Sequence, residues 1–203
     1  MNRAQAALGK VRIIGGRWRG TSLPVADADG LRPTSARARE TLFNWLQPVL
    51  PGARVLDLFA GSGALGLEAL SRGAREALLV ERDAGLAESL RQTVARLHAN
   101  EEAQVVAADA LAFLRVPLHG RFDIVFVDPP FAAGLWPGVF AALPPWLAGE
   151  AWLYAESPVA GGTPEPGDHF RLHREGRTRE ARHALYQRVT LPEDPSEPGV
   201  RRE

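Results

Sequence analysis

The sequence has no cysteine among its 203 residues, and all but one of its 24 basic residues are arginine. Without cysteine, a disulfide framework, a thiolate metal site and a cysteine nucleophile are all excluded. No apolar run approaches the roughly 20 residues of a membrane-spanning helix, and the first ten residues lack the apolar core of a secretory signal. We therefore expect a cytoplasmic protein that does not act at a membrane.

Charge is distributed unevenly along the chain, although the formal net charge is zero. Residues 1–50 contain eight basic and three acidic side chains, whereas residues 51–203 contain sixteen and twenty-one. Arginine suits planar recognition of phosphate and stacking on bases. A basic N-terminal segment on an acidic body indicates a polyanion that docks at one end of the molecule.

The residue pattern divides the chain into a basic arm (1–50), a main domain (51–191) and a tail with the composition of a disordered segment (192–203). In the arm, residues 11–23 predict two short strands around a tight turn at Gly15 and Gly16. A helix then follows Pro33, with Thr34 or Ser35 as its N-cap. We therefore expect a small hairpin and one helix ahead of the main domain.

The main domain alternates short apolar runs with longer amphipathic segments. We expect strands at 55–59, 77–81, 104–109, 122–128 and 151–157, and helices at 64–72, 84–99, 110–115 and 135–147. This alternation is typical of an α/β protein whose mostly parallel sheet is covered on both faces. The last segments, FRLHREG and ARHALYQRVT, instead predict a terminal antiparallel hairpin, and the region around them is unusually rich in arginine.

A glycine-rich motif follows the first strand of the main domain. Residues 61–66, GSGALG, match G-x-G-x-x-G between a strand and a helix, and Glu81 ends the next strand, where an acid can accept ribose hydroxyls. Asp57 would repel a pyrophosphate but attract the ammonium of an amino-acid ligand, and Asp109 suits an adenine amine. These acids favour S-adenosylmethionine as the cofactor, with S-adenosylhomocysteine as its product. The expected cofactor-binding residues are Asp57, Phe59, Ala60, Gly61, Ser62, Gly63, Glu81, Arg82, Asp109 and Ala110.

Each of these acids also has a purely structural interpretation. Glu81 could be a solvated strand end, Asp109 could cap the following helix, and Asp57 could make a hydrogen bond within the turn. The five histidines are scattered without the spacing of metal ligands, so we expect no metal site.

The tetrapeptide DPPF, residues 128–131, directly follows the fourth strand. Ligands of open α/β sheets bind beyond the carboxyl ends of the strands, so this segment should lie beside the glycine loop. The Asp128 carboxylate and the Pro129 carbonyl can each accept one hydrogen of an exocyclic amine, which aims the nitrogen lone pair at a methyl group. Pro129 and Pro130 stiffen the loop, and Phe131 offers a face for base stacking. We therefore expect Asp128, Pro129, Pro130 and Phe131 to be catalytic.

The arm supplies the candidate residues for nucleic-acid binding. Alternation along a strand would place Arg17 and Arg19 on one face, opposite Trp18. Arginines of this kind contact phosphate and position a nucleic acid without reading its sequence. The alternative is a solvated basic surface with Trp18 packed on the domain. The expected substrate-binding residues are Arg12, Arg17, Arg19, Arg32, Arg37 and Arg39.

Five motifs together carry a resemblance to a known family: VRIIGGRWRG, LRPTSARARETLFNWL, FAGSGALGLEALSRGA, VFVDPPF and LYQR. The sequence resembles class I S-adenosylmethionine-dependent methyltransferases and, more narrowly, the bacterial guanine-N2 methyltransferases of small-subunit ribosomal RNA, over about residues 11–188. The resemblance implies a Rossmann-like fold with a seven-stranded, mostly parallel sheet, a terminal antiparallel hairpin and a small N-terminal hairpin and helix. It also implies N2-methylation of one guanine of 16S rRNA, in the small subunit or its assembly intermediate. We expect a monomer.

Other functions stay open at this stage. The DPPF motif also suits adenine N6 in DNA or RNA, or a protein glutamine amide, because all of these present an sp2 amine. A catalytically inactive RNA-binding or assembly factor could retain the fold, although the intact DPPF and glycine motifs disfavour this. Asp57 and the lack of a paired acid–base residue disfavour an NAD-dependent oxidoreductase.

Overall fold

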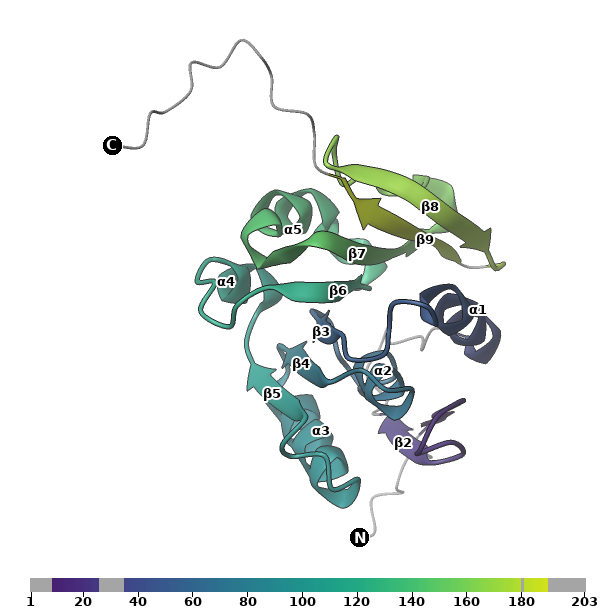
Figure 1. The fold of residues 1–203 in the computed structure, drawn as a ribbon, viewed down its shortest axis with the longest axis vertical. Coiled ribbons are helices and arrows are strands. Elements are labelled where there is room, and N and C mark those ends of the chain that lie inside the picture. Colours follow the sequence, from purple (N-terminus) through teal and green to yellow (C-terminus); the bar gives the residue numbers. More distant parts are fainter. Residues whose placement is uncertain (1–8, 26–34, 180, 190–203) are drawn as a thin grey trace, which may run out of the picture.

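The computed structural model describes residues 9–25, 35–179 and 181–189. Its centre is a seven-stranded sheet with the order β5-β4-β3-β6-β7-β9-β8 (Figure 1). The strands are β3 (Arg54–Asp57), β4 (Glu76–Glu81), β5 (Ala103–Ala107), β6 (Phe122–Val127), β7 (Leu147–Pro158), β8 (Phe170–Arg177) and β9 (Ala181–Arg188). Strands β3 to β7 are parallel, whereas β9 is antiparallel to both β7 and β8. The predicted α/β fold class and terminal antiparallel hairpin are confirmed.

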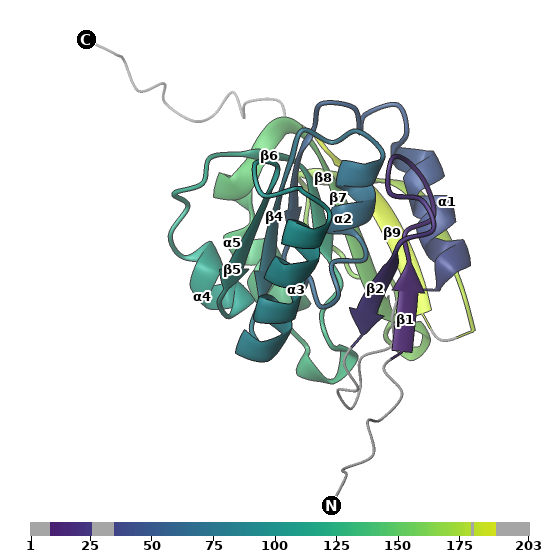
Figure 2. The ribbon, with the colours of Figure 1, turned by 90° about the horizontal axis from the view of Figure 1, so that it is seen from below.

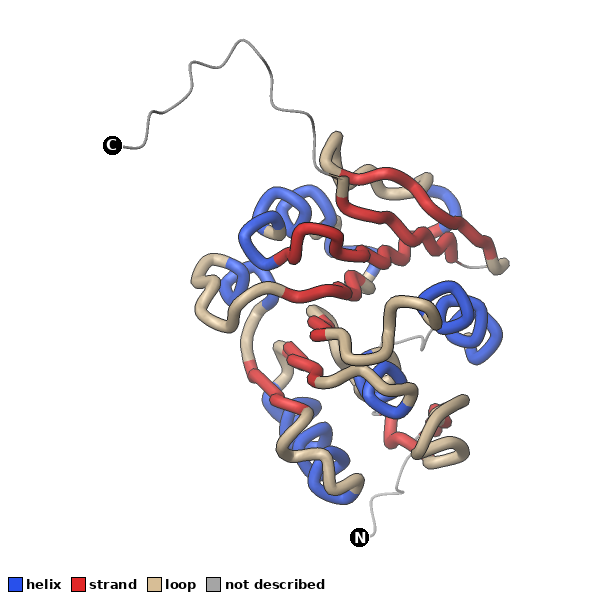
Figure 3. Tube along the Cα trace, in the orientation of Figure 1, coloured by secondary structure: helices blue, strands red, loops and turns tan. Residues whose placement is uncertain are grey.

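Helices cover both faces of this sheet (Figures 2 and 3). They are α1 (Ala36–Leu46), α2 (Gly66–Ser71), α3 (Ala84–Arg96), α4 (Ala110–Leu114) and α5 (Trp136–Ala142), with 3-10 turns η1 (Phe131–Ala133), η2 (Pro144–Trp146) and η3 (Val159–Gly161). Helices α1, α2 and α3 share one core cluster with the sheet, and α4 and α5 pack in the other. None of the helices in the described residues has the length and apolar character of a membrane-spanning segment.

Local sequence signals set most helix boundaries. The side chain of Ser35 caps α1 by accepting a hydrogen bond from the Ala38 nitrogen at 3.2 Å, and Asp83 caps α3 in the same way. The predicted helix at 135–147 is wrong in extent, since α5 ends at Ala142 and a separate turn begins at Pro144. Pro144 and Pro145 lack the backbone N–H that would continue an α-helix.

The N-terminal hairpin is present, but its turn is not at Gly15 and Gly16. Strand β1 (Gly9–Arg12) pairs antiparallel with β2 (Ser22–Val25), and nine residues connect them. This connection lies against α2, where the Arg17 nitrogen donates to the Ser71 carbonyl at 2.9 Å. Gly16 has a φ of 73°, and a Cβ there would lie 1.8 Å from the Ser71 carbonyl oxygen. The glycine pair therefore permits close packing on a helix and does not form a two-residue turn.

The N-terminal segment shares its core with the main domain. Ile13, Leu23, Leu42 and Phe43 are buried in the same cluster as the apolar residues of β3 and α2. Several expectations fall outside the described residues: the loose N-terminal end, Arg32, the alternative cap Thr34 and the tail at 192–203.

Candidate active site

The glycine loop joins β3 to α2 at the carboxyl edge of the sheet. Gly61 and Gly63 have φ values of 50° and 79°, which favour glycine. A Cβ on Gly66 would lie 2.1 Å from a methyl carbon of Leu79, so this position also requires the smallest residue. The motif therefore specifies a tight turn followed by close packing of α2 on β4.

Glu81 holds the loop from the end of β4. Its Oε2 atom accepts a hydrogen bond from the Gly61 nitrogen at 2.9 Å, and its Oε1 atom accepts one from the Asp83 nitrogen at 2.8 Å. The carboxylate thus links the glycine loop to the start of α3. The side chain is half-buried, so it also faces the space beyond the strand ends.

Asp57 lies beneath the loop and not on its surface. It is 2% exposed, and its Oδ2 atom accepts a hydrogen bond from the Gly66 nitrogen at 3.0 Å. Burial raises the pKa of its carboxyl to about 7, against the lowering effect of hydrogen bonds from the backbone of Gly66 and Phe59. The direct contact between Asp57 and a ligand ammonium that the charge pattern predicts is not offered by this geometry, because the carboxylate is covered. Asp57 positions the loop instead.

The other expected cofactor residues surround this edge of the sheet. Asp109 is exposed after β5 and caps α4, since its Oδ1 atom accepts a hydrogen bond from the Ala112 nitrogen at 3.0 Å. Gly61 and Ser62 are half-buried, as is Phe59; Ala60, Gly63 and Ala110 are buried, and Arg82 is exposed. The three predicted acids thus follow three adjacent strands: β3, β4 and β5.

The DPPF segment follows β6, which pairs directly with β3. Asp57 is in register with Phe126, so Asp128 lies two residues beyond that pair, at the same edge as the glycine loop. Asp128 is half-buried, Pro129 is buried, and Pro130 and Phe131 are exposed. The Phe131 ring is 37% exposed and its centroid lies 6.3 Å from that of Trp136. The two motifs are therefore brought together as the sequence predicts.

The sequence analysis missed a buried polar group behind this segment. The Tyr154 hydroxyl donates a hydrogen bond of 3.0 Å to the Glu156 carboxylate, and the Trp136 indole nitrogen donates one of 3.0 Å to the Glu156 carbonyl. Burial, together with the negative charges of Glu156 and Asp128, holds the pKa of Tyr154 well above its usual value. An acid inside the apolar run AWLYAES was the signal that could have identified this group.

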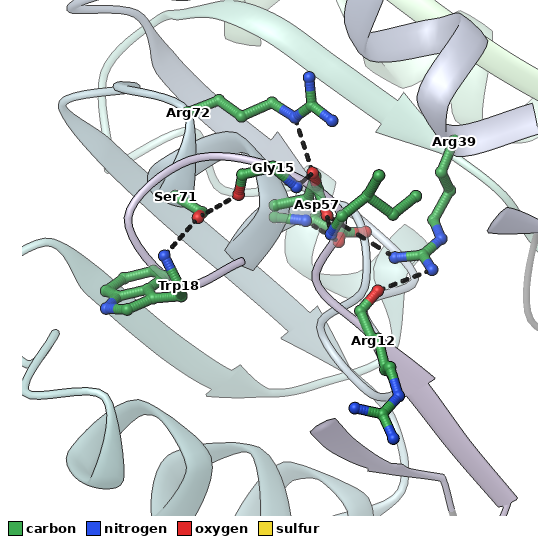
Figure 4. Close-up of polar contacts among 10 residues, drawn as sticks. Arg12, Gly15, Trp18, Arg39, Asp57, Ser71 and Arg72 are labelled. Atoms are coloured by element: carbon green, nitrogen blue, oxygen red, sulfur yellow. Dashed lines mark hydrogen bonds and ion pairs between the residues drawn. The ribbon is translucent and has the colours of Figure 1, made fainter. Parts of the chain in front are cut away.

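A second buried acid, Glu68, anchors the N-terminal segment to α2. Its carboxylate accepts hydrogen bonds from the nitrogens of Ile14 at 2.7 Å and Gly15 at 2.8 Å, and from Nε of Arg72 at 2.6 Å. Ser71 extends this contact, since its hydroxyl donates to the Gly15 carbonyl and accepts from the Trp18 nitrogen (Figure 4). Helix α2 therefore carries the glycine loop at one end and the N-terminal connection at the other.

The structure separates the six arginines expected to bind substrate. Arg39 is 2% exposed, with Nη1 3.8 Å from Glu68 and Nη2 donating to the Arg12 carbonyl at 2.9 Å. It cannot contact RNA in this position, so the expectation for Arg39 is wrong. Arg12, Arg19 and Arg37 are exposed.

Arg17 is also exposed, but it is already engaged within the protein. It pairs with Glu102 and stacks on the Trp18 ring at 4.1 Å. The Arg17 side chain holds the pKa of the Glu102 carboxyl below its usual value. The connection between β1 and β2 forms turns and not strands, so the predicted placement of Arg17 and Arg19 on a strand face opposite Trp18 does not occur.

Comparisons with known proteins agree with this geometry. Residues 11–187 match the model of the family described as conserved hypothetical protein 95. The chain is 50% identical to the ribosomal RNA small subunit methyltransferase D of Escherichia coli strain K12, over 89% of this chain and 91% of that protein. It is 44% identical to the protein of the same name from Haemophilus influenzae, over 74% and 80% of the two chains.

Solved structures show the same relationship. The structure of yhhF from Escherichia coli aligns with a TM-score of 0.81 and 47% identity, over 90% of this chain and all of that one. A methyltransferase fold with a glycine loop and DPPF at one sheet edge is thus shared by sequence and structure. The chain belongs to the family of the bacterial ribosomal RNA small subunit methyltransferase D.

Proposed function

We propose that this protein transfers a methyl group from S-adenosylmethionine to the exocyclic N2 amine of a guanine in 16S rRNA. The observation that carries the proposal is the placement of the glycine loop and DPPF at the carboxyl ends of the paired strands β3 and β6. The names of the relatives support ribosomal RNA of the small subunit as the substrate. The guanine and its N2 position rest on the resemblance of the motifs.

The residues at the edge of the sheet fit the proposed cofactor. The positive φ of Gly61 and Gly63 leaves the loop without side chains where a ligand would approach. Glu81 and Asp109 offer carboxylates at neighbouring strand ends to ribose hydroxyls and to an adenine amine. When bound, S-adenosylmethionine supplies a methyl group already activated on a sulfonium.

The protein's own contribution is then positioning. Asp128 and the Pro129 carbonyl accept the hydrogens of the target amine and direct its lone pair, and the two prolines hold these acceptors in place before the reaction. Phe131 is partly exposed and offers its ring to the target base. The guanine would be turned out of its stack to reach this edge.

The site and the family support a monomeric cytoplasmic enzyme that acts on the small subunit or an assembly intermediate. The test is transfer of radiolabelled methyl to small subunits from cells that lack this gene, followed by nucleoside analysis. Label in N2-methylguanosine is the expected result. Label in N6-methyladenosine would overturn the guanine assignment, and no label on subunits would overturn the RNA substrate.

Binding of the cofactor is tested separately. S-adenosylhomocysteine should raise the melting temperature, whereas NADH should not, because only a ligand that binds the native state stabilises it. Stabilisation by NADH alone would overturn the methyltransferase proposal and favour an oxidoreductase.

A further inference from the structure

The turn between β8 and β9 lies at the same edge of the sheet as DPPF. Val127 at the end of β6 pairs with Ala155 of β7, and pairing of β7 with β9 continues three residues further, to Pro158 and Ala181. At about 3.3 Å per residue, the turn extends roughly 10 Å beyond the end of β6. The arginine-rich segment singled out in the sequence therefore flanks the proposed methyl-transfer site.

This turn places like charges against one another. Arg177 on β8 is directly opposite Arg182 on β9, so their side chains share one face of the hairpin. Like charges in such a cross-strand pair destabilise a sheet. Arg179 in the turn is exposed and adds a third guanidinium. These three residues, Arg177, Arg179 and Arg182, form the hairpin arginine cluster.

The cluster lacks internal compensation in the described part of the chain. There, the side chains of Arg177 and Arg179 make no hydrogen bond or ion pair, and Arg182 donates only to the Val159 carbonyl at 3.4 Å. Glu175, the nearest acid on β8, contacts the Thr163 hydroxyl instead, at 3.5 Å. An external anion would offset this repulsion.

The N-terminal segment is less well placed for the same task. The Arg17 partner Glu102 directly precedes β5, and Ser71, which holds the Arg17 nitrogen, precedes the return to β4. Both therefore lie at the edge where the parallel strands begin, opposite DPPF. Arg39 is buried. The exposed arginines with free side chains at the reaction edge belong to the C-terminal hairpin within the described residues, together with Arg37 of α1.

We propose that the hairpin arginine cluster binds phosphates of the substrate RNA next to the target nucleotide. This inference rests on the proposed function, since it takes RNA as the substrate. Arginine presents a planar fork of donors that matches phosphate oxygens, and each phosphate contact releases condensed counterions. The cluster thereby fixes the position of the RNA backbone while DPPF receives the base.

The test compares two double variants with equal loss of charge. Arg177→Gln with Arg179→Gln removes two guanidiniums from the hairpin. Arg75→Gln with Arg121→Gln removes two exposed ones that directly precede β4 and β6, at the opposite edge. Binding to a fluorescent single-stranded RNA of the target sequence is measured across a salt series, and methyl transfer is measured on small subunits that lack the modification.

The hairpin variant should lower the slope of log K against log salt by about 1.4, or roughly 0.7 for each lost phosphate contact on a single strand. At 0.15 M salt this corresponds to roughly tenfold weaker RNA binding, with an equal rise in KM and unchanged affinity for S-adenosylhomocysteine. The control variant should match the wild type. Unchanged melting temperatures show that both variants fold.

Three outcomes would overturn the inference. The slope for the hairpin variant could equal that of the control, which would remove the cluster from the RNA interface. The variant could lose affinity for subunits but keep RNA binding, which would make the partner a protein surface. Equal losses in both variants would show nonspecific charge attraction. In each case a wild type that still methylates subunits keeps the proposed function intact, whereas an inactive wild type refutes that function instead.

Discussion

Glu68 and Arg39 form an ion pair in which both side chains are withdrawn from solvent. Their nearest charged atoms are 3.8 Å apart, and the side chains are 0% and 3% exposed. The pair joins α2 to α1, and the same carboxylate also holds the main chain of Ile14 and Gly15. Burial lowers the pKa of Arg39, while the charge of Glu68 raises it. The carboxylate therefore offsets a buried positive charge that would otherwise be costly.

Glu68→Gln should destabilise the protein by about 3–5 kcal/mol, because it leaves the Arg39 charge buried without its counterion. Denaturant unfolding followed by circular dichroism measures this loss. Glu88→Gln is the matched control, since Glu88 pairs with Arg91 on the exposed face of α3 and should change stability by no more than about 0.5 kcal/mol. Equal stabilities for the two variants would contradict the anchoring role.

Gly16→Ala should loosen the connection between β1 and β2 from α2. The added Cβ would lie 1.8 Å from the Ser71 carbonyl oxygen, and the φ of 73° adds backbone strain. Gly20→Ala separates the two effects, because Gly20 has a φ of 85° but no atom within 4 Å of its Cβ position. We expect Gly20→Ala to cost about 1–3 kcal/mol from strain alone and Gly16→Ala to cost more. Limited proteolysis after Arg17 and Arg19 should be accelerated only in Gly16→Ala, and equal cleavage would contradict the docked arrangement.

Asp57 should make stability depend on pH near neutrality. Its pKa of about 7 lies above the ordinary value of 3.8, so the native state binds this proton more tightly than the unfolded state. The contribution of the group to stability is therefore present at low pH and lost as the pH rises through 7. Relative to Asp57→Asn, which does not titrate, the wild type should gain roughly 3 kcal/mol as the pH falls from 8 to 5.

Unfolding of both proteins at several pH values measures this difference, and the titration of all other groups cancels in the comparison. A free-energy difference between wild type and Asp57→Asn that stays constant over this range would show that Asp57 has an ordinary pKa.

Asp128→Asn should abolish methyl transfer without preventing cofactor binding. The amide replaces one acceptor for the target amine with a donor, and we expect kcat to fall by about a hundredfold or more. Asp168→Asn, at an exposed position before β8, is the matched control. Single-turnover transfer measures the chemical step, and titration with S-adenosylhomocysteine measures binding. Full activity of Asp128→Asn would remove this carboxylate from the reaction.

Local patterns carried most of the fold into the sequence analysis. The apolar runs ending at Asp57, Glu81 and Val127 are strands, and Ser35, Asp83 and Asp109 each cap a helix. These features depend on residues within a few positions of one another. The juxtaposition of DPPF with the glycine loop was also predictable, because parallel strands bring their carboxyl ends to one edge.

The missed features depend on partners far apart in the sequence. Nothing near Arg39 indicates that it is buried, since its counterion Glu68 lies 29 positions later on α2. Asp57 is withdrawn because the Gly66 nitrogen reaches it from the next helix. The Gly15 and Gly16 pair resembles a hairpin turn until Ser71 is known to pack against it. Tertiary contacts overrode a correct local preference in each case.

The docking of the first strands on α2 also has a consequence for synthesis on the ribosome. Gly15 and Trp18 bind Glu68 and Ser71 across separations of 53 to 56 residues. The N-terminal hairpin cannot reach its place until the glycine loop and α2 have left the exit tunnel, and closing so long a segment slows folding. The nascent chain thus carries its basic N-terminus undocked, next to ribosomal RNA, for the time needed to make about a quarter of the protein.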